Sequence, residues 1–441
     1  MGLQQTIKAA FSESLWELRE RPRQFLGLCL LAGALLFSYG ISRPTVESLF
    51  LETYGKDRLP HVWLAVAVAA ALAVLVYNRF ATRVQVTRLY LGAALVAATT
   101  LVLLLAGRGI IPHATFLLYV WKDVHIVVLV EIFWSFANLL YPVRSARWAY
   151  GLFCAAGSLG AMSAESTVGL LASAWGTQAT LWAVAPLLVV GGLGCTLLGT
   201  DTNQRLQSNS GRGSVTEKMT AGLRTVSNSR YLVPLLALIG IIQITITLID
   251  YQFNGAIAAA YPATDARTGV IGKVYAAISF GSLLLQLGTG PVLKFAGVPF
   301  VLLGIPAVLG GAVGLFALSP RFLTMAVAKV CSKAFDYSLF RAAKEILYIP
   351  LSYSEKTQGK AFVDMLTYRV AKGGASLLLL WLSAAQVGAT GMSVVNLALI
   401  GAWLVLAFVI ARRYLRLRHE QADTATAASP GVEPTPQSSG A

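Results

Sequence analysis

Long apolar runs separated by short polar segments are the dominant pattern of the chain. Each run can form an α-helix of about 20 residues, the length that crosses the hydrocarbon core of a bilayer. Six runs precede a polar, basic segment and six follow it. They lie near residues 25–42, 61–79, 87–106, 113–142, 149–174, 178–199, 231–258, 270–293, 298–318, 321–350, 361–387 and 391–411. We therefore predict an all-α membrane protein with twelve transmembrane helices in two six-helix halves.

The same pattern divides the chain into five consecutive parts. An amphipathic N-terminal segment (1–24) precedes the first half (25–200), and a linker (201–230) separates it from the second half (231–411). The tail (412–441) is first basic and then rich in Ala, Thr, Ser and Pro, a composition typical of disorder. The N-terminal segment lacks the form of a cleavable signal peptide.

The composition supports a membrane location. Of the 441 residues, 56% are hydrophobic and 12% are charged, whereas a soluble protein carries about 25% charged residues. This excludes a soluble enzyme, a nucleic-acid binder and a secreted disulfide scaffold. The four cysteines show no CxxC pairing, so they imply neither a metal site nor a disulfide framework. We expect no cofactor. The Ala-rich sequence favours a bacterial inner (plasma) membrane.

The positive charges predict the orientation of the chain. The formal net charge is +15, and Lys and Arg gather on the cytoplasmic side of membrane proteins. Basic residues follow the second and fourth runs, occupy the linker and end the last run. All of them lie on one side if both termini are cytoplasmic. Two six-helix halves joined by a cytoplasmic linker are the layout of the major facilitator type, in which the halves face a cavity near the midplane.

Four of the predicted spans carry ionisable or amide residues on one face. An ionisable group inside a bilayer is costly, so it tends to face protein or a water-filled cavity. Spans one, four, seven and ten line the cavity in major facilitator transporters. The stripes are Asp123 and Glu131 in the fourth span, Gln243, Thr247, Asp250 and Asn254 in the seventh, Lys329, Lys333, Asp336 and Lys344 in the tenth, and Asp364 and Lys372 with neighbouring Arg369 in the eleventh.

Several cations in one cavity suit an anionic small molecule such as a phosphorylated solute. The predicted substrate-binding residues are Lys329, Lys333, Lys344, Arg369, Lys372, Asp250, Gln243, Asn254, Asp123 and Arg43. Glu131, Asp336 and Asp364 are predicted to form gating salt bridges. For each of these residues the alternative is a structural ion pair or, at a helix end, snorkelling. His125 is interpreted as structural, and for Glu165 the structural and functional interpretations both stay open.

No enzyme motif stands beside these stripes. The P-loop, HExxH and GxSxG patterns are absent from the sequence. We therefore predict that the chain is not an enzyme. Its expected partners are the lipid bilayer and the anionic solute, with no nucleic acid.

Three segments resemble one known family. The second half contains YSLFRAAKEILYIPLS from Tyr337, KTQGKAFVD from Lys356 and AKGGAS from Ala371. FWSFAN from Phe133, followed by RWAYGLFCAAGSLGA, and LIDYQFNGAIAAAYP from Leu248 are similar to two further motifs of that family. Together they resemble the nonmitochondrial ATP/ADP translocases of plastids and intracellular bacteria, across both halves.

The resemblance implies a twelve-helix carrier that exchanges nucleotides, typically ATP against ADP, and needs the lysines and acidic residues of its spans. Asp250 keeps the acidic character of the seventh span. Lys333, Lys344, Lys360 and Lys372 stand at basic positions of the C-terminal motif.

Two positions depart from the family pattern. Val46 occupies the position of a lysine after the first span. In the fourth span the acidic position falls at Lys122, with Asp123 adjacent. A lost or reversed charge alters substrate choice tenfold or more if each charge-assisted hydrogen bond contributes ~1.5–3 kcal/mol.

The sequence therefore favours a secondary carrier of nucleotides that works by alternating access. The first alternative is a carrier of another phosphorylated or organic anion, with or without proton coupling. The second alternative is a membrane scaffold or sensor that keeps the fold without transport.

Overall fold

The structure is a computed structural model that describes residues 22–81, 83–141, 143–198, 223–349, 351–352, 355 and 360–427. Within these ranges, side chains are described except at residues 78, 143–148, 361–362, 364–369 and 418–427. Most of the predicted N-terminal segment, most of the linker and the end of the tail lie outside the described residues. The described chain is almost entirely helical.

The first half consists of α-helices and two short 3₁₀ turns. The helices are α2 (Pro22–Tyr54), α3 (Leu59–Ala81), α4 (Val86–Ala106), α5 (Ala114–Leu140), α6 (Val143–Trp175), α7 (Thr177–Thr180) and α8 (Val184–Leu198). The 3₁₀ turns are Lys56–Arg58 and Leu181–Ala183, the second of which joins α7 to α8.

The second half follows the same plan with one interrupted helix. Its helices are α10 (Leu232–Ala260), α11 (Thr264–Phe295), α12 (Gly297–Leu318), α13 (Phe322–Phe335), α14 (Arg341–Leu347), α15 (Lys360–Ala384) and α16 (Ala389–Ala427). A π-helical segment, Asp336–Phe340, joins α13 to α14.

Eight of the described helical segments are long and apolar enough to cross a membrane. Spanning segments are helical because a bilayer offers the backbone no hydrogen-bond partners, so each segment must satisfy its own. The all-α membrane prediction is thereby confirmed at this level. The apolar runs at 178–199 and 321–350 correspond to helices that contain a break, at Leu181–Ala183 and at Asp336–Phe340.

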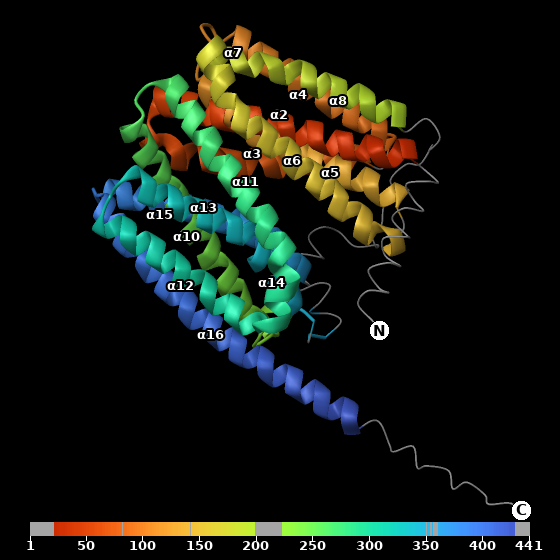
Figure 1. Ribbon diagram of the computed structural model, residues 1–441, viewed down its shortest axis with the longest axis vertical. Helices are drawn as coiled ribbons and strands as arrows, with labels where there is room; N and C mark the ends of the chain where they lie inside the picture. Colours follow the sequence, from red (N-terminus) through yellow and green to blue (C-terminus); the bar gives the residue numbers. More distant parts are fainter. Residues whose placement is uncertain are drawn as a thin grey trace, which may run out of the picture.

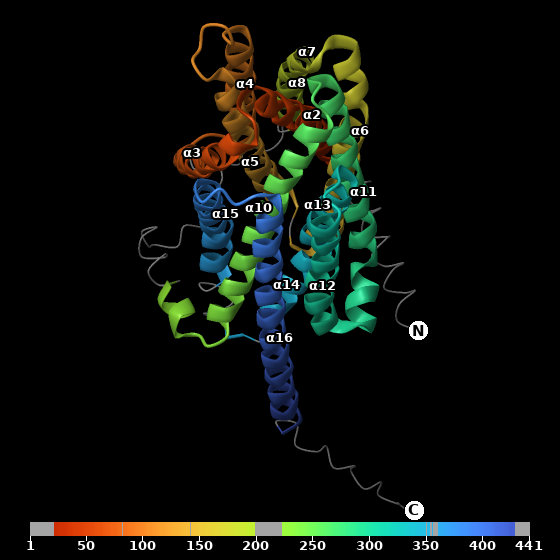
Figure 2. The ribbon, with the colours of Figure 1, turned by 90° about the vertical axis from the view of Figure 1, so that its left-hand side faces the viewer.

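Two helical bundles lie side by side in the molecule (Figure 1). Helices α2–α8 form one bundle, and α10 with α12–α16 forms most of the other. Helix α11 runs between them and packs along α6 and α2, while α15 packs against α3. The bundles approach each other at the end where α7 and the start of α11 lie, and they diverge toward α8 and α14 (Figures 1 and 2).

The first helix is longer than its apolar run. The sequence places the run at 25–42 and Arg43 near its outer end, but α2 continues through Pro44 to Tyr54. Close packing explains how α2 reaches so far into the bundle. A Cβ atom on Gly160 of α6 would lie 2.2 Å from the carbonyl oxygen of Gly33 of α2, so only glycine permits this approach. The residues from Pro44 to Leu51 are buried, so α2 lies inside the molecule well beyond its apolar run.

Candidate functional site

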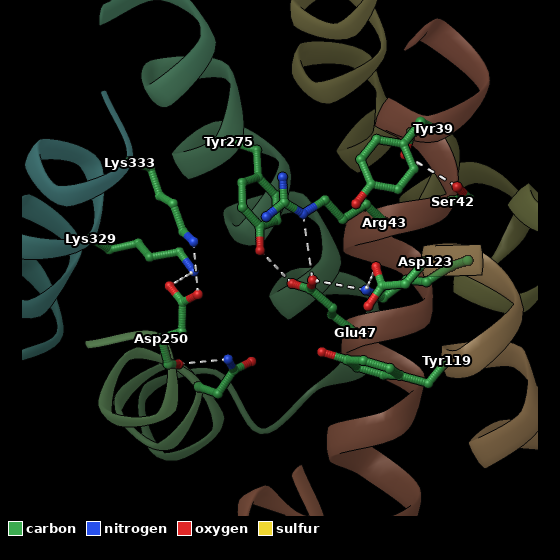
Figure 3. Close-up of polar contacts among 12 residues, drawn as sticks. Tyr39, Ser42, Arg43, Glu47, Tyr119, Asp123, Asp250, Tyr275, Lys329 and Lys333 are labelled. Carbon is green, nitrogen blue, oxygen red and sulfur yellow. Dashed lines mark hydrogen bonds and ion pairs between the residues drawn. The ribbon is translucent and has the colours of Figure 1, made fainter. Parts of the chain in front are cut away.

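Two charged clusters face each other between the halves (Figure 3). We define the N-half cluster as Arg43 and Glu47 of α2 with Lys122 and Asp123 of α5. We define the C-half cluster as Asp250 of α10 with Lys329 and Lys333 of α13. The helices that carry the two clusters are mainly apolar, so each cluster is a small group of charged residues surrounded by apolar side chains in a membrane-spanning bundle.

The N-half cluster is balanced in charge. Glu47 Oε1 lies 3.6 Å from Arg43 Nε and 3.4 Å from Lys122 Nζ. Lys122 Nζ also lies 2.9 Å from Asp123 Oδ1. Two cations thus meet two carboxylates, and Lys122 is almost fully buried between them. Such a cluster compensates most of its own desolvation.

The C-half cluster carries a surplus of positive charge. Lys329 Nζ lies 2.5 Å from Asp250 Oδ1, and Lys333 Nζ lies 3.0 Å from Asp250 Oδ2. The two lysines are four residues apart on α13, so both ammonium groups project from one helix face. Within 4.0 Å the carboxylate of Asp250 faces two ammonium groups, that of buried Lys329 and that of half-buried Lys333, so this wall of the site is electropositive.

Tyr275 of α11 lies between the two clusters (Figure 3). Its hydroxyl donates a hydrogen bond to Glu47 Oε2 at 2.6 Å. The Arg43 guanidinium carbon lies 3.8 Å from the centroid of its ring, a cation–π distance. Lys329 Nζ lies 5.6 Å from the same centroid. One side chain of the second half therefore contacts charges of both clusters.

Further aromatic rings border the N-half cluster. The Arg43 guanidinium lies 5.7 Å from the Tyr39 ring, and Lys122 Nζ lies 4.0 Å from the Tyr119 ring. Trp121 stacks on His125, with ring centroids 4.1 Å apart, and His125 Nδ1 lies 2.9 Å from the Trp121 carbonyl oxygen. This packing agrees with the structural interpretation of His125.

Several buried polar atoms at or beside the site have no hydrogen-bond partner among the described residues. They include Arg43 Nε, His125 Nε2 and Asn254 Oδ1. The Asn254 amide nitrogen donates to the Asp250 carbonyl oxygen at 2.7 Å, one turn earlier on α10. A buried polar group without a partner is unfavourable, so these atoms are suited to a polar ligand or to water.

Asp336 lies where α13 passes into the π-helical segment. Gln243 of α10 donates to Asp336 Oδ1 at 3.4 Å. A π-helical turn inserted in an α-helix is rare and often marks a functional site. Lys344 is buried on α14, roughly 16 Å beyond Lys333 at 1.5 Å per residue, so it lies far along the helix from the C-half cluster.

The remaining predicted site residues lie at the margin of the clusters, or their side chains are outside the described residues. Lys372 of α15 is half-buried and interacts electrostatically with Asp123 across the halves. Glu131 is exposed on α5, two turns after Asp123. The side chains of Asp364 and Arg369 lie outside the described residues, so their predicted roles stay predictions.

Three central residues were absent from the predicted site. Glu47 lies beyond the apolar run that marked the first span, so the run gave no reason to place it inside the bundle. Lys122 lies on a different face of its helix from the predicted stripe. Tyr275 carries no charge that hydropathy would reveal. The charges of Glu47 and Lys122 were nevertheless a usable signal, because both lie within or next to a predicted span.

The halves are joined at one end by a polar and glycine-lined contact, which we call the closed end (Ser48, Thr177, Asp265, Arg267 and the pair Gly169 and Gly269). Arg267 Nη2 donates to the Ser48 carbonyl oxygen at 2.9 Å. Asp265 Oδ1 accepts from the Thr177 hydroxyl at 2.6 Å. A Cβ atom on Gly169 of α6 would lie 2.8 Å from Cα of Gly269 of α11, so these helices meet backbone to backbone.

Solved structures of membrane transporters have the same fold. The nucleoside transporter NupG, in a crystal structure of a point mutant, aligns with a TM-score of 0.69 at 14% sequence identity, covering 88% of this chain and 99% of that protein. The POT family transporter PepTSo aligns with a TM-score of 0.62 at 13% identity, covering 91% and 99%. These likenesses establish the fold alone. The fold is therefore of the major facilitator-like type.

Part of the second half resembles one known family. Residues 305–414 match the TLC ATP/ADP transporter family. The predicted resemblance to the nonmitochondrial ATP/ADP translocases is thereby confirmed. The matched family and relatives are carriers, in agreement with the prediction that the chain is not an enzyme.

Plant and bacterial relatives extend the match beyond that domain. The plastidic ATP/ADP-transporter of Solanum tuberosum is 24% identical over 331 residues, which cover 67% of this chain and 52% of the relative. ADP,ATP carrier protein 3 of Rickettsia felis is 22% identical over 439 residues, covering 82% of this chain and 87% of the relative. The matched region of the chain spans about half the length of its plastid relatives.

Proposed function

We propose that this protein is a secondary transporter that exchanges nucleotides, with ATP and ADP as its substrates. The matched family and the relatives named as ADP,ATP carriers support this substrate class. The observation that carries the proposal is the C-half cluster, in which Lys329 and Lys333 share the single carboxylate of Asp250. A nucleotide supplies the additional negative charge that this wall of the site lacks.

The phosphates bind against the C-half cluster. Their oxygens accept charge-assisted hydrogen bonds from Lys329 and Lys333. These bonds replace part of the contact between the two lysines and Asp250. Lys372 adds a further cation from α15, and Arg43 adds its Nε donor from the N-half cluster. Each such bond contributes ~1.5–3 kcal/mol. The arrangement holds phosphate as an ion and needs no hydrolysis.

The base and sugar lie toward the N-half cluster. The rings of Tyr39, Tyr119 and Tyr275 offer apolar faces beside the charged groups. Gln243, Asn254 and Asp123 supply polar groups for the sugar or base, and the buried Asn254 Oδ1 acceptor is available to a donor. Lys344, which is buried on α14, and Arg369 of α15 are further cations for the phosphates, as the sequence predicts.

The exchange proceeds by alternating access of two six-helix halves with twelve membrane spans. Both termini are cytoplasmic and the membrane is a bacterial inner membrane. The closed end then faces outward, and the conformation described here is open to the cytoplasm. Glu131, Asp336 and Asp364 form salt bridges that exist in one conformation and break in the other.

Counterflow in proteoliposomes tests this function. Vesicles loaded with unlabelled ADP should take up labelled ATP or ADP, whereas empty vesicles should not. Lys333→Met should abolish most of the uptake, while Lys273→Met, which alters an exposed lysine of α11, should leave it near the level of the native protein. Absence of uptake of any nucleotide by loaded vesicles would refute the proposal.

A second candidate is the exchange of another phosphorylated or organic anion. It is favoured by the buried Val46, which stands where the family has a lysine, and by Lys122, which is held by Glu47 and Asp123. A panel of unlabelled competitors against one labelled substrate distinguishes the two. Competition by sugar phosphates or organic acids, with none by ATP or ADP, would favour this candidate.

A further inference from the structure

Glu165 is a buried carboxyl group that the site described above does not use. It lies on α6 where this helix packs against both α2 and α11, and its exposed fraction is 5%. Ser279 of α11 donates a hydrogen bond to Glu165 Oε2 at 2.7 Å. A Cβ atom on Gly40 of α2 would lie 3.4 Å from Glu165 Cγ, so the side chain is enclosed on both sides.

The surroundings of Glu165 contain little compensating charge. Among the described residues it has no ion pair within 4.0 Å, and its only hydrogen-bond donor is the Ser279 hydroxyl. Arg43 of α2 is the charged group that interacts electrostatically with Glu165 across the helix contact, and Glu47 of α2 and Tyr275 of α11 are the titratable groups around Arg43. Arg43 is already held by Glu47 and stacked on Tyr275.

Glu47 offers a comparison within the same bundle. It is equally buried, but it contacts two cations and a tyrosine hydroxyl. A carboxylate with that environment keeps its charge, whereas a carboxylate with one serine partner does not recover the free energy lost on leaving water. The two environments thus favour an ionised Glu47 and a neutral Glu165 in this conformation.

The position of Glu165 connects its proton to the movement of the halves. The α6–α11 contact joins the first half to the second, and one turn beyond Glu165 it becomes the glycine contact of the closed end. A Cβ atom on Gly272 would lie 2.5 Å from the Glu165 carbonyl oxygen, so the two helices meet at this residue itself. Separation of α6 from α11 at this contact would remove the Ser279 donor from Glu165 and expose the carboxyl group to water.

We propose that Glu165 is a proton-binding site of the carrier, filled when the closed end is shut and emptied when it opens. Closing transfers a proton from water to the Glu165 carboxylate, and opening returns it to water. The proton site itself does not depend on the proposed exchange function, but its effect on transport does. Nucleotide exchange then depends on pH, because an ionised Glu165 resists closing.

The transport test compares pH profiles of counterflow for native protein, Glu165→Gln and Glu52→Gln. Native uptake should fall at least fivefold as the pH is raised with equal pH on both sides, and Glu165→Gln, which is always neutral, should stay active there. Glu52→Gln, which changes an exposed carboxylate of α2, should follow the native profile. Ser279→Ala removes a donor to the carboxylate and should move the decline to higher pH.

A second measurement needs no nucleotide and separates the two proposals. Thermal unfolding of the purified protein in detergent should show a midpoint that falls with rising pH more steeply for the native protein than for Glu165→Gln. If that difference is present but no nucleotide is exchanged, the proton site stands and the exchange function fails. If exchange is present while native protein and Glu165→Gln share both pH profiles, the proton site is overturned.

Discussion

The two charged clusters differ in what they leave uncompensated. In the N-half cluster every charge has an opposite partner within 3.6 Å, and Glu47 has a further donor in Tyr275. In the C-half cluster one carboxylate serves two ammonium groups. The first arrangement is balanced in charge, whereas the second has a surplus positive charge that an anion can balance. The number of opposite charges around an ionic group therefore indicates better than its position in the span whether the group can bind an anion.

This difference arises from the helices that meet at each cluster. Helices α2 and α5 each bring one cation and one carboxylate, so their contact is neutral. Helix α13 brings two lysines on one face, whereas α10 brings only Asp250 to them. Removing one member of a buried ion pair costs about 3–5 kcal/mol, because it leaves the other charge unpaired. The two clusters should thus respond differently to the loss of one charge.

Asp250→Asn should have the largest effect. It leaves Lys329 and Lys333 without a carboxylate, which should lower the free energy of unfolding by ~3–5 kcal/mol and abolish exchange. ADP should then raise the thermal midpoint of the variant more than that of the native protein, since phosphate replaces the missing charge. Addition of both Lys329→Met and Lys333→Met should recover stability without exchange, because no ammonium group is then left without Asp250. A variant with native stability and no enhanced response to ADP would contradict the description of this cluster.

Lys333→Met should come next, with little loss of stability. Asp250 keeps Lys329 as a partner, so the remaining pair is balanced, but one phosphate ligand is lost. A charge-assisted hydrogen bond of ~1.5–3 kcal/mol predicts a loss of tenfold or more in nucleotide affinity. Concentration dependence of counterflow measures it, with Lys273→Met as the control. Unchanged affinity would mean that the surplus charge of the C-half cluster is not used for the substrate.

Tyr275→Phe tests the contact between the clusters. The ring remains against Arg43, but Glu47 loses the hydroxyl donor. We expect a loss of about 1.5–3 kcal/mol at most, the range for a hydrogen bond to a charged group, with a lower thermal midpoint and a modest decrease in exchange. Tyr119→Phe, whose hydroxyl accepts from Trp63 Nε1, is the matched variant with a neutral partner. An effect of Tyr119→Phe as large as that of Tyr275→Phe would argue against a special link.

Lys360→Gln should have the smallest effect. Lys360 pairs with Glu345, but both side chains are partly exposed. Exposed pairs contribute ~0–1 kcal/mol, because water already solvates each ion. The thermal midpoint and the exchange rate should stay near the native values. A loss comparable to that of Lys333→Met would show that this exposed pair belongs to the transport machinery.

Much of the C-half cluster could be predicted from the sequence. The spacing of Lys329 and Lys333 places them on one face of one helix, and Asp250 is the charged residue of the seventh apolar run. Helical periodicity is enough to group these residues on one face, because each stripe lies on a single helix. The partner of each residue could not be predicted, since it depends on which helices pack together. Gln243 shares the stripe of Asp250 and yet contacts Asp336.

The N-half cluster was predicted less well, for a physical reason. Hydropathy ends the first run before Arg43, although α2 extends to Tyr54. Glu47 is tolerated inside the bundle only because Arg43, Lys122 and Tyr275 compensate it, and these partners come from three helices. A pattern along one segment contains no information about such compensation. The resemblance to the family located Asp123 and Lys122 but did not show that they contact each other.

The sequence by itself determined the helices and the membrane environment of this protein. Apolar runs must become helices in a bilayer because the backbone can find hydrogen bonds only within each run. The tertiary structure alone decided which charges are compensated, which are in surplus and which carboxyl group is enclosed without a cation. Glu47 and Glu165 have the same side chain and similar burial, and they differ only in the residues that neighbouring helices bring to them. Electrostatic interactions depend on distance in space, and folding sets that distance.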